Sequence, residues 1–278
     1  MGRSVKATVT GRPAIDGAGV RMVRVLGDAT VRDFDPFLML DSFDSTDPYD
    51  YMRGFPFHPH RGIETITYLA AGRIDHRDSL GNAGSIGADQ AQWMCAGSGI
   101  LHEEMPQPSD RLLGVQVWLN LPRSEKMCTP AYHAIENPPV VAVGAARARV
   151  VGGSLAGARG FSGDHLPADF FDLEIPANCN IEIPVKQGHA AYVFLLEGDA
   201  LVAGARYPEK TAIAFADDGS TVDLGADGEP ARVLYFSAPR LDEPVAWGGP
   251  VVMNTQRELA EAFAELERGT FIKERPEL

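Results

Sequence analysis

Short runs of apolar or alternating residues recur along the whole chain, and Gly, Pro, Asp and Asn clusters separate them at close spacing. These runs are VRMVRVL, FLMLDSF, ETITYLAAG, LLGVQVWLNL, RARVVGG, FFDLEI, AAYVFLLEG, TAIAFA and ARVLYFSA. Strands of this length between frequent turns are typical of all-β sandwiches and barrels. The pattern therefore predicts an all-β fold built from many short antiparallel strands.

One helix is predicted near the C-terminus. Thr255 and Glu258 form a T-x-x-E capping box, and Gly269 suits a C-terminal stop. Leu259, Phe263 and Leu266 fall on one face of the helix between them. We therefore expect one short helix with an apolar face near the C-terminus.

An internal echo indicates two similar halves. YLAAGRI at residues 68–74 resembles FLLEGDA at residues 194–200, because each reads as an aromatic-Leu-x-x-Gly strand and turn. The segment ENPPVVAVG has the composition of a linker. We therefore expect two tandem barrels, with domains at residues 1–136 and 137–278.

Composition narrows the possible partners. The chain has 25 basic and 38 acidic residues, so its formal charge of −13 opposes direct binding to nucleic acid or to anionic membranes. No apolar run reaches the roughly 18 residues that a membrane-spanning helix needs. The three cysteines are widely spaced, without a C-x-x-C pair, as in reduced cytoplasmic proteins. A cytoplasmic location is the resulting expectation.

Two pairs of candidate metal ligands stand out. His58 and His60 lie two residues apart in FPFHPHRGIETI, and His102 and Glu104 lie two apart in QWMCAGSGILHEEMP. In an extended chain, side chains two residues apart point to the same face. Two facing strands of a barrel could thus bring three imidazoles and one carboxylate to one cation, with positions left open for water.

A structural explanation competes with this one. A lone His-x-His pair is more often part of a surface loop, and Pro59 between the histidines fits a loop or an edge strand equally well. The second pair and the Gly-Ser-Gly turn before it shift the balance toward a metal site. A gapless overlay of the two halves places Pro184 at His58 and Lys186 at His60, so the second half is expected to lack this site.

Several ordered motifs resemble the pirin family, a branch of the cupin superfamily. They cover nearly the whole chain and are DPFLMLDSF (35–43), HPHRGIET (58–65), QWMCAGSGILHEEMP (92–106), GVQVWLNLPRSEKM (114–127) and GPVVMNT (249–255). The resemblance implies a bicupin, with two stacked antiparallel β-barrels and a metal only in the N-terminal one.

The resemblance also implies a ligand set. Carried over by position, the metal ligands are His58, His60, His102 and Glu104, all present without departure from the family motif. Glu64 occupies the place of a ligand in many other cupins, but in pirin-like proteins it lies close to the metal without binding it. One divalent metal ion per chain is implied, with Fe(II) first and Zn, Mn, Ni, Co or Cu as alternatives.

Quercetinase activity, in which O₂ opens the heterocycle of a flavonol, is associated with pirin-like proteins. Glu104 is the expected proton acceptor, because a carboxylate ligand that loosens can serve as a general base. Gln116 is expected near the metal, and Phe55 and Phe57 are expected to form pocket wall. The alternatives are that Trp118 and its neighbours cover an outer face of the barrel and that the two phenylalanines belong to the core. The partners would then be a small aromatic flavonol and O₂.

Two other functions use the same ligands. The first is a non-enzymatic redox-sensing regulator, in which iron oxidation adds one charge to the barrel and alters docking on a transcription factor or metabolic enzyme. The second is a cupin isomerase or hydrolase with zinc or manganese. Elemental analysis separates the zinc and manganese possibilities from the iron ones.

Overall fold

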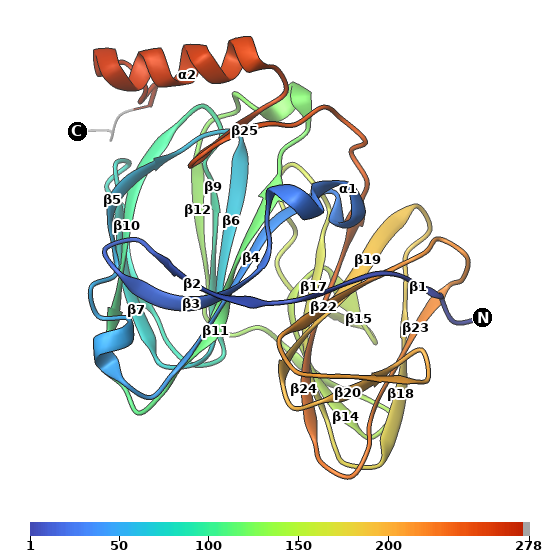
Figure 1. Cartoon of the computed structure of the whole chain (residues 1–278). Coiled ribbons are helices and arrows are strands. Elements are labelled where there is room, and N and C mark those ends of the chain that lie inside the picture. Colours follow the sequence, from blue (N-terminus) through green and yellow to red (C-terminus); the bar gives the residue numbers. More distant parts are fainter. Residues whose placement is uncertain (275–278) are drawn as a thin grey trace. The chain divides into compact units, whose positions relative to one another are not determined.

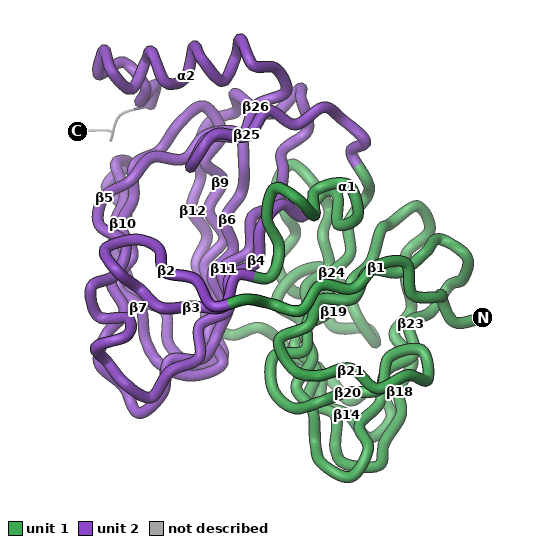
Figure 2. The backbone as a smooth tube through the Cα atoms, viewed as in Figure 1, with its two compact units in different colours: residues 1–12, 25–36, 137–240 green, residues 13–24, 37–136, 241–278 purple. Residues whose placement is uncertain are grey.

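The computed structural model describes residues 1–274, which form two compact units (Figures 1 and 2). We call residues 13–24, 37–136 and the described residues from 241 onward the first barrel. Residues 1–12, 25–36 and 137–240 form the second barrel. The expected all-β architecture with two cupin-like barrels and one C-terminal helix is confirmed.

The first barrel is built mainly from two antiparallel sheets. The larger has the strand order β12 (Ala131–Ile135), β9 (Gln90–Cys95), β6 (Ile63–Ala71), β11 (Leu112–Asn120), β4 (Phe37–Ser45), β3 (Val20–Leu26) and β2 (Arg12–Asp16). The smaller has the order β5 (Phe55–His60), β10 (Ile100–Gln107), β7 (Arg73–Asp78) and β8 (Ala83–Ile86). A third pair, β25 (Ala246–Gly248) and β26 (Val251–Met253), and the turns η2 (Pro48–Asp50) and η3 (Arg123–Glu125) complete it.

The second barrel repeats this arrangement of sheets. Its larger sheet has the order β1 (Val5–Thr10), β22 (Thr211–Phe215), β19 (His189–Glu197), β24 (Ala231–Pro239), β17 (Asp169–Ile175), β14 (Ala146–Gly152) and β13 (Val140–Val143). The smaller sheet has the order β18 (Cys179–Pro184), β23 (Thr221–Ala226), β20 (Ala200–Val202) and β21 (Ala205–Tyr207). The short elements are β15 (Ser154–Leu155), β16 (Ala158–Arg159), η1 (Asp28–Thr30) and α1 (Val31–Phe34).

The ends of the chain divide differently from the expected domains 1–136 and 137–278. Strand β1 pairs with β22, with Thr8 opposite Ile213, so the N-terminal strand belongs to the second barrel. It takes the edge position that β12 holds beside β9 in the first barrel. The C-terminal segment belongs to the first barrel (Figure 2). A linear boundary misses this arrangement because strand pairing at a sheet edge does not follow chain order.

The echo between the halves marks equivalent turns. Gly72 follows β6 with φ +94°, and Gly198 follows β19 with φ +71°. Glycine has no Cβ and adopts this left-handed backbone without strain. The overlay fails further upstream, however, because four residues separate β18 from β19 and only two separate β5 from β6. The side chains that enter the second barrel from β18 are Ile181 and Ile183, not Pro184 or Lys186.

The predicted helix is α2 (Gln256–Arg268). Thr255 and Glu258 form the expected reciprocal capping box, and Gly269 ends the helix with φ +68°. Leu259 and Ala262 are buried in a small apolar cluster of the first barrel with β25, β26 and Phe271. None of the helices within residues 1–274 is long and apolar enough to cross a membrane.

Candidate metal centre

Three histidines of the first barrel converge from two paired strands. Strand β5 runs antiparallel to β10, with His58 opposite His102. The ring centroid of His102 lies 4.4 Å from that of His58 and 5.0 Å from that of His60. One ring nitrogen from each residue lies within 4.8 Å of the other two. The paired strands thus bring together the three imidazoles that the sequence motifs indicate.

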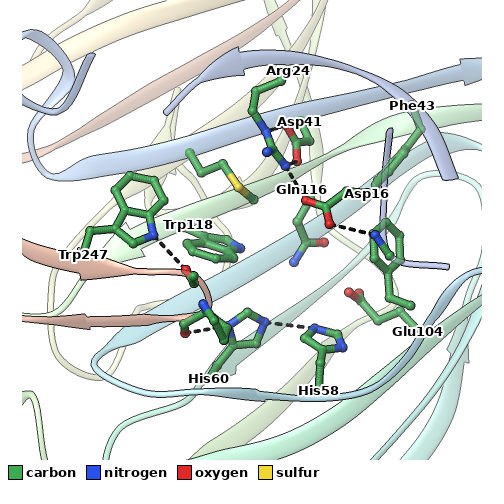
Figure 3. A pocket seen from close by; sticks show the side chains of 15 residues that line it. Asp16, Arg24, Asp41, Phe43, His58, His60, Glu104, Gln116, Trp118 and Trp247 are labelled. Carbon is green, nitrogen blue, oxygen red and sulfur yellow. Dashed lines mark hydrogen bonds and ion pairs between the residues drawn. The ribbon is translucent and has the colours of Figure 1, made fainter. Parts of the chain in front are cut away.

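Backbone carbonyls fix the orientation of two of these rings. Nδ1 of His58 lies 2.9 Å from the carbonyl of Pro56, and Nδ1 of His60 lies 3.1 Å from the carbonyl of Pro250. A carbonyl only accepts, so each Nδ1 carries the proton and donates it. The two Nε2 atoms, 3.1 Å apart, then turn their lone pairs toward the same space (Figure 3).

Burial keeps these imidazoles neutral. Burial lowers the pKa of His58. Burial, and then the repulsion that a protonated His58 would exert, lowers the pKa of His60 to about 3. Without protons on either Nε2, the two atoms repel each other at 3.1 Å. A cation between them removes this repulsion, because neutral imidazole nitrogen is a common metal ligand.

His102 gives an independent test of this fit. Its Nε2 is buried and has no hydrogen-bond partner among the described residues. Burial first, and then the neighbouring His60, lowers its pKa well below the ordinary value, so the ring is neutral. Buried polar atoms almost always have a partner. An unpaired buried nitrogen on the third ring of this cluster therefore fits a divalent metal ion.

Glu104 lies in the same cavity but not within the cluster of nitrogen atoms. Its Oε1 accepts a hydrogen bond from Thr67 Oγ1 at 2.7 Å and another from Gln92 Nε2. Burial raises the pKa of Glu104 to about 7, although both hydrogen bonds act in the opposite direction. The geometry makes Glu104 a neighbour of the imidazoles, and its role as a fourth ligand stays a prediction.

Gln116 and Trp118 line the cavity from β11. Thr67 Oγ1 lies 2.6 Å from Gln116 Oε1, so Thr67 connects Gln116 with Glu104. The indole ring of Trp118 meets the His60 ring edge-to-face at 5.0 Å, and Trp247 lies 5.6 Å from Trp118. These two indoles form an aromatic wall beside His60.

Of the two residues predicted to form the pocket wall, Phe55 lines the cavity and Phe57 does not. The pairing of β5 with β10 shifts register, so that Glu104 lies opposite Phe55 instead of Pro56. This bulge turns Phe55 into the cavity. Phe57 is 46% exposed and lies 5.1 Å under the guanidinium of Arg77, outside the cavity. The expectation that Phe57 forms pocket wall is therefore wrong, because strand alternation points it away from His58.

Glu64 is buried but does not line the cavity. Its carboxylate accepts a hydrogen bond of 2.8 Å from the indole nitrogen of Trp93. Glu64 lies opposite Cys95 in the pairing of β6 with β9. Its placement near the metal stays a prediction, and the contact with Trp93 indicates a role in orienting β6 and β9.

A charged cluster on the cavity wall was not predicted. Arg24 donates two hydrogen bonds to Asp41, of 2.9 and 2.7 Å, and one of 2.7 Å to Asp16. Asp41 is buried, and burial raises its pKa even though Arg24 lowers it. The sequence did contain a signal for this ion pair, because Arg24 lies within the apolar run VRMVRVL and Asp41 within FLMLDSF. A charge that is buried with its strand requires a partner of opposite charge.

The cavity that these residues enclose has a volume of about 440 Å³, within the range of small-molecule sites (Figure 3). Its wall combines aromatic, imidazole and carboxylate groups, and comes from β2, β3, β4, β5, β10, β11 and the β25–β26 hairpin. Trp247 and Pro250 come from this distant hairpin. Pro250 lies in the GPVVMNT motif, but the sequence did not indicate that either residue lines the cavity.

Comparison with known proteins assigns each half of the chain to a family model. Residues 19–119 match the family Pirin, and residues 170–272 match the Pirin C-terminal cupin domain. A pirin-like protein of Caulobacter vibrioides is 42% identical over 275 residues, which cover 97% of this chain and 99% of that protein.

Solved structures agree with this assignment. A quercetin 2,3-dioxygenase from Acinetobacter baumannii superposes with a TM-score of 0.89 at 31% identity, covering 98% of this chain and 99% of that one. A bacterial pirin from Escherichia coli in complex with nickel(II) has a TM-score of 0.66 at 22% identity, covering 84% and 99% of the two chains. The second likeness concerns the fold alone.

Proposed function

Because the chain belongs to the pirin family, we propose that its first barrel is a metal-dependent dioxygenase site for flavonols, of the quercetin 2,3-dioxygenase type. The observation that carries this proposal is the convergence of three neutral imidazoles, one with a buried unpaired Nε2. The Acinetobacter baumannii structure supports the reaction type by its name.

The proposed ligands are His58, His60, His102 and Glu104. Fe(II) is the first expectation, and nickel is one of the alternatives. A divalent metal bound here supplies Lewis acidity that lowers the pKa of a flavonol hydroxyl group. The donor set of imidazole and carboxylate suits either metal.

Glu104 is the proposed proton acceptor. Its pKa of about 7, raised by burial, allows it to take a proton near neutral pH. Thr67 and Gln92 hold its Oε1 from β6 and β9, so the carboxylate is oriented by strands that carry none of the three histidines. Its other oxygen, Oε2, is then the atom that can either bind the metal or accept the substrate proton.

The rest of the wall suits a flat polyphenol. Trp118, Trp247, Phe43 and Phe55 supply aromatic surface for ring stacking. Asp16 lies on the same wall, and its carboxylate can accept hydrogen bonds from phenolic hydroxyl groups. Aromatic walls with a few oriented polar groups are typical of small-molecule sites.

Oxygen consumption tests the proposal. Protein loaded with Fe(II) or Ni(II) should consume O₂ and bleach the visible absorption of quercetin, and His102→Ala should do neither. His189→Asn, in the second barrel, is the matched control and should retain the activity. Fully metallated protein that leaves O₂ and every member of a flavonol panel unchanged would refute the proposal.

A further inference from the structure

Two cysteines of the first barrel lie next to each other and do not line the cavity of the metal centre. Cys95 ends β9, and Cys128 follows the turn η3. Their Sγ atoms are 3.4 Å apart. Cys95 is 1% exposed, whereas Cys128 is partly exposed. The pair therefore has one buried thiol and one that small molecules can reach.

The backbone holds this pair in place. The amide of Ser98 donates to the carbonyl of Cys128 at 2.8 Å, and the amide of Cys128 donates to Glu125 at 3.0 Å. Gly97 has φ +42°, and a Cβ there would lie 2.2 Å from the Cys128 carbonyl oxygen. Only glycine fits this approach, so the loop at Gly97 is built to bring the two cysteines together.

We propose that Cys95 and Cys128 form a reversible dithiol–disulfide site that is oxidised by hydrogen peroxide. The sulfur atoms need to approach by roughly 1.4 Å to reach a disulfide bond length of about 2.05 Å. This inference does not rest on the proposed dioxygenase function.

The two thiols have different roles. The Cys95 thiol donates to Cys128 and lowers its pKa, which favours the nucleophilic thiolate on the more exposed residue. The Cys128 thiolate attacks the peroxide oxygen, which yields a sulfenic acid and, after protonation, water. The Cys95 thiol then displaces hydroxide from that sulfur, and its proton completes a second water. The protein loses two electrons and two protons, and the peroxide gains them.

This site connects directly to the strands of the metal centre. The segment after Cys95 leads into β10, which carries His102. The amide of Gly62 donates to the carbonyl of Gly97 at 2.9 Å, and Arg61 Nε donates to the carbonyl of Ser98 at 2.7 Å. Both donors follow β5. A shift of this loop on oxidation therefore reaches both histidine-bearing strands.

The test treats the full-length chain, freed of redox-active metal by a chelator, with hydrogen peroxide. After denaturation and alkylation, the number of free thiols should fall from three to one, with a mass loss of two hydrogen atoms. Peptide mapping should find Cys95 linked to Cys128, and dithiothreitol should restore three thiols. Cys128 should react about tenfold or more faster than Cys179.

Single-cysteine variants provide the controls. Cys179→Ser should still form the link, and Cys128→Ser should keep both remaining thiols after mild oxidation. Cys95→Ser should form no link but should carry one added oxygen atom on Cys128, because the resolving thiol is missing. In the wild-type chain, oxygen addition at Cys128 without a link, a disulfide between two chains, or equal oxidation of Cys179 would overturn the proposal. Mapping of the wild-type chain decides the matter even if a variant fails to fold.

Discussion

The two barrels share a sheet topology but differ in their interiors. In the first barrel, Gln116 of β11 lies opposite Asp41 of β4 and Thr67 of β6. In the second barrel, Tyr235 of β24 lies opposite Phe171 of β17 and Val193 of β19. The corresponding positions are polar in one barrel and belong to a continuous apolar core in the other. Similar backbones can therefore enclose either a cavity or a packed core, depending on a few inward side chains.

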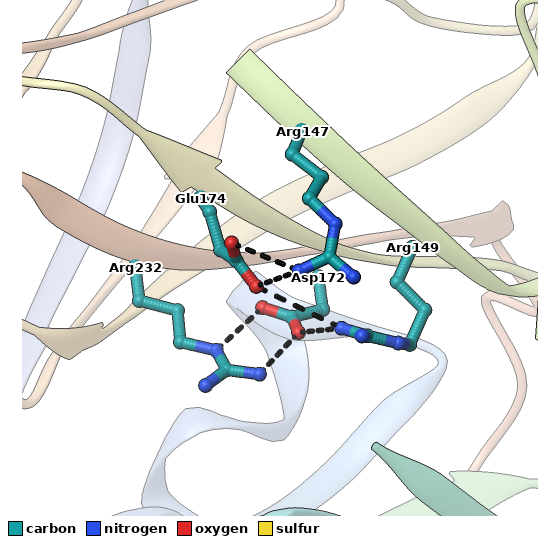
Figure 4. A network of polar contacts seen from close by, with 5 residues as sticks. All are labelled: Arg147, Arg149, Asp172, Glu174 and Arg232. Atoms are coloured by element: carbon teal, nitrogen blue, oxygen red, sulfur yellow. Dashed lines mark hydrogen bonds and ion pairs between the residues drawn. The ribbon is translucent and has the colours of Figure 1, made fainter. Parts of the chain in front are cut away.

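Charges in the second barrel are paired away from its core. Asp172 accepts two hydrogen bonds from Arg232, of 3.0 and 2.7 Å, and one of 3.1 Å from Arg149 (Figure 4). Arg147 and Glu174 extend this network. Asp172 alternates with Phe171 and Leu173 along β17, so it points away from the apolar side. Within the described residues, the second barrel by itself holds no triad of clustered metal-ligand atoms.

Loss of one histidine should have the largest effect. We expect His102→Ala to weaken divalent-metal affinity by more than about 100-fold. Mutating a residue that only hydrogen-bonds to a metal ligand typically costs up to about 100-fold, and removal of a ligand itself should cost more. His189→Asn in the second barrel should leave the affinity unchanged. Isothermal titration of metal-free protein checks both, and equal losses in the two variants would remove the distinction between the barrels.

Truncation of an inward side chain should cost more unfolding free energy in the second barrel than in the first. Phe171→Ala should cost about 3–5 kcal/mol of unfolding free energy, because it opens a cavity in a packed interior. Gln116→Ala should cost about 1 kcal/mol or less, since its side chain already borders a cavity. Denaturant unfolding of the metal-free variants measures both values. A larger loss for Gln116→Ala would show that the first interior is the tighter one.

An exchange at one equivalent position sharpens the comparison. Val193→Thr should cost about 1–3 kcal/mol, because it buries a hydroxyl group in apolar surroundings. Thr67→Val should cost about 1 kcal/mol, since Glu104 keeps its hydrogen bond from Gln92. The same unfolding measurement compares them. Equal costs would indicate that the second barrel can also accommodate polar groups.

The smallest expected effect concerns the helix of the first barrel. Burial raises the pKa of Glu265, but hydrogen bonds from Lys273 and Arg61 outweigh it and leave a lowered pKa. A carboxylate with a lowered folded-state pKa stabilises above its unfolded pKa, and this contribution is lost as pH falls through the folded pKa. Glu265→Gln should therefore cost less than about 1 kcal/mol at pH 7.

The pH dependence distinguishes this explanation from a packing effect. The stability difference between wild type and Glu265→Gln should shrink as the pH falls below about 4, where the carboxylate becomes protonated. Thermal unfolding between pH 7 and pH 3 follows it. A difference that stays constant across this range would mean that charge plays no part.

Much of this comparison could be predicted from the sequence. Alternating apolar runs indicated the β fold, and the capping box of Thr255 and Glu258 marked the start of α2. The aromatic-Leu-x-x-Gly motifs that end at Gly72 and Gly198 indicated the repeat. These features are local, because backbone conformation and side-chain alternation depend on near neighbours. The HPH and HEE spacings indicated the three histidines for the same reason.

The remaining features depend on distant contacts. The pairing of β1 with β22 brings together residues about two hundred positions apart, and Pro250 orients His60 from 190 positions away. The bulge that turns Phe55 inward and leaves Phe57 outside depends on the register with β10. A single sequence specifies such pairings only through the folded structure.

Anomalous X-ray diffraction from crystals of the nickel(II)- or iron(II)-loaded protein tests the central claim most directly. We predict one strong peak per chain between His58, His60 and His102, with a Glu104 oxygen at a ligand distance of about 2.0–2.2 Å. The second barrel should show no peak. A peak inside the second barrel, or none among the three histidines, would contradict the assignment of the metal to the first barrel.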